Sequence, residues 1–151
     1  MVNHIFKADI DTLIKLRLGY ISQEIIISDE EKERLTPHLT KYFEEHISND
    51  SFTAYGYFLN DQIISSAFLI TDKCPPGLNN LNGTFGIIMN VFTYPEHREK
   101  GYARAVMEYL IEDAKRKGIQ VLDLYATENG KPLYEKLGFK IIDYTAMKLK
   151  I

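Results

Sequence analysis

The chain has one cysteine, no tryptophan and no apolar run long enough to cross a bilayer. The lone Cys74 excludes an internal disulfide, and we interpret it as a loop thiol because it directly precedes two prolines. The N-terminus has no signal-peptide core. We therefore expect a cytoplasmic protein that does not bind a membrane.

Metal-ligand spacing is also missing, because the four histidines are scattered along the sequence without partners at helical or turn spacing. The formal net charge of −3 argues against a general polyanion-binding surface, so nucleic acid is not an expected partner. The 151 residues, 45% of them hydrophobic and 26% charged, suffice for one globular domain with its own core. No repeat or linker is evident, and we expect a single domain over residues 1–151.

The most informative stretch that is present covers residues 85–117. Apolar residues up to Thr93 have strand-like spacing, and Pro95 ends the strand because proline cannot donate to a sheet ladder. After Gly101 the apolar residues recur at i, i+3, i+4 and i+7, which predicts an amphipathic helix that stops at Gly118. Alternation along the strand predicts two faces, with Phe85, Ile87, Met89, Val91 and Thr93 on one and Ile88, Asn90 and Phe92 on the other.

The turn between this strand and this helix is the main chemical feature. Gly101 allows a ligand to approach the backbone closely, and the residues after it expose amides that have no intrahelical partner. Such a helix start suits a phosphate or pyrophosphate, and Arg98, Lys100 and Arg104 add positive charge around it. The same residues also fit an ordinary strand-to-helix turn with a solvated charge cluster.

The N-terminal part predicts a short strand followed by two helices. The strand covers residues 2–7, and the first helix begins at residues 8–9 with one of the two nearby aspartates as its cap. Ser28 followed by Glu31 is a capping-box signature for the second helix. Pro37 lies within that helix, so we expect the helix to restart or kink there.

The remaining elements complete an alternation of strands and helices. Two strands over 52–59 and 62–71 flank a polar dipeptide typical of a hairpin, and a loop follows them. After the central unit we expect a buried strand over 119–126, a short helix over about 132–137, and closing strands over 139–142 and 146–149. This order indicates an α+β protein whose largely antiparallel sheet is flanked by helices.

Two short motifs resemble those of the GCN5-related N-acetyltransferase (GNAT) superfamily. Residues 98–103 (REKGYA) resemble its Arg/Gln-x-x-Gly-x-Gly/Ala signature, and residues 132–139 (PLYEKLGF) resemble its Leu-Tyr-Glu-Lys-Leu-Gly-Phe hallmark. The order of expected elements matches the family over nearly the whole chain. The resemblance implies a mostly antiparallel mixed sheet of roughly six to seven strands, about four helices, and a splay between the fourth and fifth strands.

The resemblance also implies acetyl-coenzyme A (acetyl-CoA) as the acetyl donor. Its pyrophosphate would rest on the amides of the 98–103 turn, and its pantetheine arm would pair with the end of the fourth strand. The residues implied in cofactor binding are Val91, Phe92, Thr93, Arg98, Glu99, Lys100, Gly101, Tyr102, Ala103, Arg104, Asn129 and Tyr134. Many family members carry asparagine seven residues before the tyrosine, where this chain has Thr127, so Thr127 or Asn129 could contact the arm while the other caps a helix.

Tyr134 corresponds to the family's tyrosine beside the thioester sulfur, where it would protonate the departing thiolate or orient the thioester. Alternatively, it is a packed aromatic residue of the short helix. Where some members carry a base on the fourth strand, this chain has Ile87 and Met89, so a base must lie elsewhere or act through water. Glu24, at the end of the first helix, is our candidate, and it is equally compatible with an ordinary surface carboxylate.

The predicted function is acetyl transfer from acetyl-CoA to a primary amine by direct attack in a ternary complex. A non-catalytic acyl-CoA-binding sensor or regulatory module on the same fold is the alternative, because the fourth strand offers no base. The acceptor is expected to be a small amine whose pocket is built by the first two helices and the loop over 73–83. A homodimer through an exposed sheet edge or through residues 139–151 is also compatible with the sequence.

Overall fold

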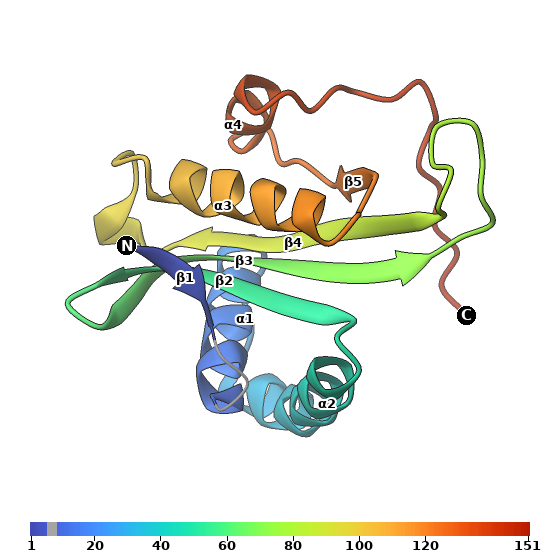
Figure 1. Cartoon of the computed structure of the whole chain (residues 1–151). Coiled ribbons are helices and arrows are strands. Elements are labelled where there is room, and N and C mark those ends of the chain that lie inside the picture. Colours follow the sequence, from blue (N-terminus) through green and yellow to red (C-terminus); the bar gives the residue numbers. More distant parts are fainter. Residues whose placement is uncertain (6–8) are drawn as a thin grey trace.

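The computed structural model describes residues 1–5 and 9–151, and Figure 1 shows how its elements are arranged. In chain order these are β1 (Val2–His4), α1 (Ile10–Glu24), α2 (Asp29–Ser48), β2 (Phe52–Leu59), β3 (Gln62–Lys73), β4 (Thr84–Thr93), the 3₁₀ turn η1 (Pro95–His97), α3 (Tyr102–Arg116), β5 (Val121–Leu124) and α4 (Lys131–Lys136). No helix in this described part is both long and apolar enough to span a membrane.

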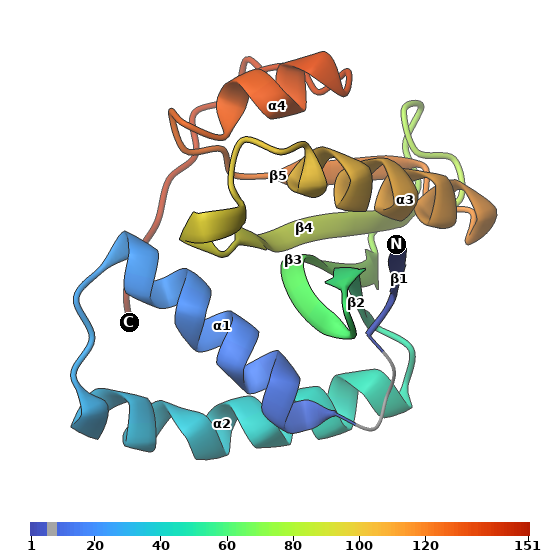
Figure 2. The same cartoon turned by 90° about the vertical axis from the view of Figure 1, so that its left-hand side faces the viewer.

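The strands form one mixed sheet in the order β1-β2-β3-β4-β5. Neighbouring strands are antiparallel except β4 and β5, which run parallel. Helices α1 and α2 cover one face of the sheet and α3 covers the other (Figure 2). The predicted α+β fold with a largely antiparallel sheet is confirmed, and the predicted hairpin turns at Asn60 and Asp61, which both have positive φ.

Local signals set the starts of the two N-terminal helices. Asp9 caps α1 by accepting a hydrogen bond from the amide of Thr12 at 3.0 Å. Ser28 and Glu31 form the predicted capping box of α2. The predicted restart at Pro37 is wrong, because α2 continues through it as one 20-residue helix. Proline removes one helical hydrogen bond, and the remaining turns of this long, capped helix outweigh that loss.

Each face of the sheet carries its own apolar core. The core under α1 and α2 contains Ile5, Leu13, Ile14, Leu16, Phe43, Phe52, Ala54, Phe68 and Phe92. The core under α3 contains Tyr55, Ala67, Leu69, Ile88, Val106, Met107, Leu110, Ala114 and Ile119. The helical spacing in the sequence therefore identified the buried face of α3 correctly.

A bulge at Asn90 breaks the predicted alternation along β4. Asn90 has a φ of 55°, a conformation that asparagine tolerates better than most residues do. The register of β4 against β3 shifts at this point, so residues after the bulge exchange faces. Ile88 therefore lies in the core under α3, whereas Phe92, which was predicted on the same face, lies in the core under α1.

The two parallel strands pair only over part of their length. Their register runs from Phe85–Val121 to Ile88–Leu124, and β4 then continues to Thr93 with no partner in β5. The predicted splay between the fourth and fifth strands is therefore present. It leaves the last part of β4 without a strand partner on that side, within the residues that the structure describes.

The predicted closing strands over 139–142 and 146–149 are not formed, so the sheet has five strands instead of six to seven. Residues 140–151 follow α4 as an exposed tail (Figure 1), whose large apolar side chains are Ile141, Ile142, Tyr144, Met147, Leu149 and Ile151. Alternating side chains define the two faces of a strand but not the neighbour with which it pairs. The first predicted strand is formed over Val2–His4, and residues 6–7 of that prediction lie outside the described residues.

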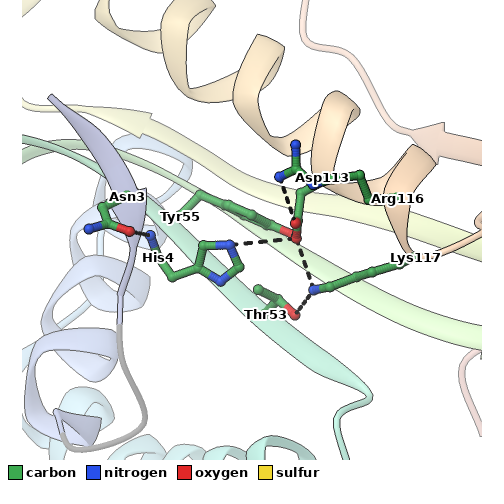
Figure 3. Close-up of polar contacts among 7 residues, drawn as sticks. All are labelled: Asn3, His4, Thr53, Tyr55, Asp113, Arg116 and Lys117. Atoms are coloured by element: carbon green, nitrogen blue, oxygen red, sulfur yellow. Dashed lines mark hydrogen bonds and ion pairs between the residues drawn. The ribbon is translucent and has the colours of Figure 1, made fainter.

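A buried polar cluster fastens the end of α3 to β1 and β2 (Figure 3). Asp113 is its centre, with a side chain that is 9% exposed. The Tyr55 hydroxyl donates to Asp113 Oδ2 at 2.7 Å, and Lys117 Nζ lies 3.0 Å from the same oxygen. Arg116 Nη2 lies 3.0 Å from Asp113 Oδ1, and His4 Nε2 lies 3.6 Å from Oδ2. The C-terminal turn of α3 is therefore held to the sheet by several charged contacts.

The charge state of Asp113 follows from these contacts. Burial alone would raise the pKa of Asp113, but hydrogen bonds from Tyr55, Lys117 and Arg116 outweigh it and lower the pKa to about 2. Because the folded-state pKa is depressed, the carboxylate stabilises the fold fully above about pH 4, near the ordinary aspartate pKa. That contribution is lost as the pH falls toward 2.

Replacing this carboxylate should cost stability in a pH-dependent way. We expect Asp113→Asn to lower the free energy of unfolding at pH 7 by about 2 kcal/mol, and the difference from the wild type to vanish near pH 2. Urea denaturation at pH 7, 4 and 2 measures both effects. Glu112→Gln, on the exposed side of the same turn, is the matched control and should leave the unfolding curve unchanged. Equal stability of Asp113→Asn and wild type at pH 7 would contradict this role.

Candidate functional site

The turn predicted to bind an anion lies between η1 and α3, at the left of Figure 1. The chain reverses through Glu99 and Gly101, whose φ values are 61° and 81°. Gly101 is the N-cap of α3, and a Cβ built there would meet no described atom within 4 Å. The backbone at Gly101 therefore faces open space and can be approached closely by a ligand.

The first amides of α3 have no acceptor among the described residues. Helical hydrogen bonding begins at the amide of Ala105, which donates to Gly101 O at 3.0 Å. The amides of Tyr102, Ala103 and Arg104 come before it and remain available. Because they also lie at the positive end of the helix dipole, they can bind an anion.

Three cations surround the turn, and each also makes a contact within the protein. Arg98 Nε donates to Thr93 O at 3.1 Å, and Lys100 Nζ donates to Glu96 O at 3.0 Å. Arg104 pairs with a glutamate one turn later on α3 at 2.8 Å. All three side chains are exposed, so they brace the turn and still surround it with positive charge.

The other predicted cofactor residues of this region offer their backbone, because their side chains are engaged elsewhere. The Tyr102 ring packs on Tyr57 with 4.5 Å between ring centroids. Val91 packs against the core under α3, and Phe92 is buried in the core under α1. The hydroxyl of Thr93 lies 2.8 Å from that of Ser65. Only main-chain groups of β4 are therefore free to pair with an extended ligand.

The second motif forms α4 and places Tyr134 against the core under α3. Its ring lies edge-on to Phe139 with 6.1 Å between centroids. Gly130 approaches the ring so closely that a Cβ there would lie 3.0 Å from it. The hydroxyl has no hydrogen-bond partner among the described residues. The ring of Tyr134 is therefore a packed aromatic group, as one of the two interpretations of the sequence proposed. Its hydroxyl remains available to a ligand.

Thr127 holds the turn that precedes α4, whose N-cap is Gly130 without a side-chain cap hydrogen bond. Its hydroxyl accepts from the amide of Gly130 at 3.2 Å, and its carbonyl accepts from the amide of Lys131 at 2.9 Å. Asn129 is exposed. Neither Thr127 nor Asn129 therefore provides the predicted side-chain cap of α4, and the Thr127 hydroxyl is used within the preceding turn.

Electrostatic effects link Tyr134 to the C-terminal half of α1. Burial, and to a smaller extent the nearby Tyr20 phenol, raises the pKa of Tyr134 to about 12. Burial and then Glu24 raise the pKa of Tyr20, whereas Arg17 opposes them. Tyr134, Tyr20 and Glu24 therefore lie in one region, although they come from opposite ends of the sequence. Glu24 itself is exposed at the last residue of α1.

Sequence reasoning missed two residues of this region, Arg17 and Asn90. Asn90 is 2% exposed and donates from Nδ2 to Leu16 O at 3.3 Å. Its Oδ1 accepts a hydrogen bond from Arg17 Nη1 at 3.4 Å. An asparagine inside an otherwise apolar strand was the available signal, because asparagine is depleted from strands and tolerates positive φ.

The predicted acceptor pocket needs one correction. The 73–83 loop begins where Lys73 pairs with Thr84, whereas the site lies at the other end of β4, where Ser65 pairs with Thr93. The ten residues of β4 span about 30 Å, so this loop does not border the site. A separate hollow of about 420 Å³ lies between the first half of α1, the β2–β3 hairpin and η1, and is lined by neither Gly101 nor Tyr134.

No metal centre accompanies these groups in the residues described. They contain no set of three histidine, cysteine, aspartate or glutamate side chains that could hold an ion. The arrangement instead offers free amides, an unpaired strand segment, a phenol and a carboxylate. These groups suit an extended anionic ligand and a reaction that moves protons.

Comparison with known proteins identifies the family. The sequence profile of the acetyltransferase (GNAT) family matches residues 22–139, which is most of the chain and includes both motifs. No curated protein matches the sequence.

Several solved structures share the fold over the full chain. A predicted acetyltransferase from Clostridium acetobutylicum, solved with acetyl-CoA, is 29% identical with a TM-score of 0.86 and covers 99% of this chain and 96% of that one. A GCN5-related N-acetyltransferase from Ralstonia eutropha is 19% identical, with a TM-score of 0.84 and coverage of 99% and 97%. Glucosamine-6-phosphate N-acetyltransferase from Arabidopsis thaliana is 22% identical, with a TM-score of 0.70 and the same coverage. The last two show likeness of fold alone.

The profile match, the mixed sheet with its splayed parallel strands and the two motifs in their expected places agree with one another. The chain belongs to the acetyltransferase (GNAT) family.

Proposed function

We propose that the protein is an N-acetyltransferase that transfers the acetyl group of acetyl-CoA to a primary amine. The observation that carries the proposal is the set of unpaired amides at Tyr102, Ala103 and Arg104 beside the open backbone of Gly101. These groups fit the pyrophosphate of a coenzyme. The similar structure from Clostridium acetobutylicum, which contains acetyl-CoA, supports the choice of ligand.

The last part of β4 would hold the extended arm of the coenzyme. Residues 89–93 have backbone groups on the β5 side that no described strand residue uses. An arm that carries amides can pair with these groups like an added strand, which directs the thioester toward the splay. Asn129 is exposed and would contact the same arm, because the Thr127 hydroxyl is used by the turn before α4.

Tyr134 is the proposed acid. With a pKa of about 12 its phenol remains protonated at neutral pH, and its hydroxyl is not engaged by the described part of the protein. It can therefore donate a proton, or a hydrogen bond, to the sulfur that leaves. The packed ring limits the motion of the side chain and keeps the hydroxyl in position.

Glu24 is the proposed base and amine anchor. It lies on the same helix as Tyr20, close enough to raise the pKa of the Tyr20 phenol, and Tyr20 in turn acts on Tyr134. A carboxylate at this place attracts a cationic amine and can accept its proton. An unchanged kcat at neutral pH in Glu24→Gln would exclude the role as base.

The acetyl group is supplied as a thioester, which is reactive toward amines. In the transfer the amine nitrogen forms a bond to the acetyl carbon as the carbon–sulfur bond breaks. Glu24 takes the proton that the amine loses, and Tyr134 supplies one to the departing thiolate. No covalent intermediate on the protein is required.

An acyl-CoA-binding sensor remains the second candidate, since Ile87 and Met89 on β4 cannot accept a proton.

Release of free coenzyme A thiol, measured with acetyl-CoA and a panel of primary amines, tests the proposed activity. Thiol release that depends on the amine supports it, whereas tight acetyl-CoA binding with no turnover on any amine would favour the sensor.

In the same assay Tyr134→Phe should lower kcat by about 10- to 100-fold with little change in the KM for acetyl-CoA. Tyr144→Phe, which changes an exposed tyrosine of the tail, is the control.

The pH dependence tests whether Tyr134 keeps its proton throughout the working range. Because the pKa of Tyr134 is about 12, its proton is present throughout the range from pH 6 to pH 10 and is lost only as the pH rises further. The ratio of the wild-type rate to the Tyr134→Phe rate should therefore stay constant over this range. A Tyr134→Phe enzyme with the full wild-type kcat would remove the proposed role.

Gly101→Ala tests the anion site. The positive φ should cost about 1–2 kcal/mol of stability for any residue with a Cβ, and the new methyl group would enter the space proposed for the pyrophosphate. We expect the Kd for acetyl-CoA, measured by calorimetry, to rise by about 10-fold or more. The matched control is Gly77→Ala, whose Cβ also meets nothing within 4 Å, at a φ outside the positive range. Equal affinity of the two variants would argue against the site.

A further inference from the structure

Arg17 is a half-buried cation whose hydrogen-bonding capacity is mostly unused. Its only hydrogen bond among the described residues runs from Nη1 to Asn90 Oδ1 at 3.4 Å. Its guanidinium carbon lies 5.6 Å from the centre of the Tyr20 ring. A guanidinium has five N–H donors, so most of its donors are left for another acceptor.

Arg17 also lacks a carboxylate partner in the described chain, unlike many other cations of this protein. Ion pairs to a carboxylate are made by Lys32, Arg104, Lys115, Arg116, Lys117 and Lys131. A half-buried charge without an opposite charge loses hydration and gains little in return. An anionic ligand would supply what is missing.

Asn90 of β4 holds the Arg17 guanidinium in position. Asn90 is 2% exposed, and its Nδ2 donates to Leu16 O on α1 at 3.3 Å. This bond turns Oδ1 of the same amide toward Arg17. Asn90 lies at the bulge of β4, just beyond Ile88, the last residue that pairs with β5. The guanidinium is therefore held beside the beginning of the splay.

The surroundings place Arg17 on the acceptor side of the proposed reaction. The Arg17 guanidinium lies over the ring of Tyr20, whose pKa is raised by burial and then by Glu24. Burial and then Tyr20 in turn raise the pKa of Tyr134. The cations around the pyrophosphate turn belong to the segment between β4 and α3, whereas Arg17 belongs to α1. Arg17 is therefore a second cationic group, separate from the turn that would hold the pyrophosphate. We expect a different anionic group to bind it.

We propose that Arg17 binds an anionic substituent of the acceptor, so that the substrate is a primary amine that also carries a carboxylate or a phosphate. This inference rests on the proposed function and specifies its substrate class. Glu24 and Arg17 would then attract the two opposite charges of one molecule. A guanidinium suits both anions because its planar donors match two oxygens at once.

Matched acceptor pairs test the proposal with the full-length protein. One arm compares L-amino acids with their carboxamides, and the other compares glucosamine 6-phosphate with glucosamine, each by thiol release from acetyl-CoA. We expect the wild type to prefer the anionic member of at least one pair by about 10- to 100-fold in kcat/KM. The arm in which this preference occurs distinguishes a carboxylate from a phosphate.

Variants show whether Arg17 is the origin of that preference. Arg17→Gln should lower the ratio of anionic to neutral kcat/KM by about 10- to 100-fold, through the KM of the anionic acceptor and not through kcat. Arg17→Lys should restore part of the preference, since it keeps the charge without the planar donors. Lys15→Gln removes an exposed cation of the same helix and should leave the ratio at its wild-type value.

Two results would overturn the inference while leaving the proposed function intact. The first is a wild type that uses the neutral members of both pairs as well as the anionic ones. The second is an Arg17→Gln variant that slows both members of a pair equally, as expected of a residue that only ties α1 to β4. Absence of thiol release with every amine would instead overturn the proposed function, and the inference with it.

Discussion

The site depends on backbone hydrogen-bond groups that the fold does not pair within the described chain. The amides of Tyr102, Ala103 and Arg104 have no acceptor among the described residues, and β4 after Ile88 has no strand partner on its β5 side. Unpaired backbone groups are costly when they are buried away from water, so an extended ligand with anionic and amide groups gains by pairing with them. The other end of α3 is held by the contacts of Asp113 with Tyr55, which keeps the helix start where it is.

A single bulge connects this unpaired strand to the opposite face of the sheet. Because Asn90 adopts a positive φ, Phe92 turns into the core under α1, and the Asn90 amide reaches both Leu16 and Arg17. The same strand therefore has three roles. Its first half pairs with β5, its last half is open, and the residue between them fixes a charge of α1 near the splay.

Much of the fold could be predicted from the sequence because the decisive signals were local. The capping box at Ser28, the hairpin dipeptide and the helical spacing after Gly101 depend on residues a few positions apart. The free amides of the 98–103 turn follow from the same kind of signal, because a helix start always leaves its first amides unpaired. The turn, Gly101 and α4 accordingly occur where the two motifs placed them.

The errors concern interactions between distant residues. Strict alternation could not show that Asn90 would interrupt it, and the apolar pattern after Phe139 did not reveal that its strands would lack a partner. The nearness of Tyr20 to Tyr134 and the contact of Arg17 with Asn90 depend on how α1 crosses the sheet. No short-range pattern encodes that packing, so Arg17 could be identified only in the folded chain.

Amide hydrogen exchange, followed by NMR with and without saturating acetyl-CoA, tests the central claim most directly. If the amides at the start of α3 hold the pyrophosphate, exchange at Tyr102, Ala103 and Arg104 should slow markedly when the coenzyme is added, while exchange at Gly77 in the distant loop should not change. Unchanged exchange at all three positions in a protein that demonstrably binds acetyl-CoA would contradict it.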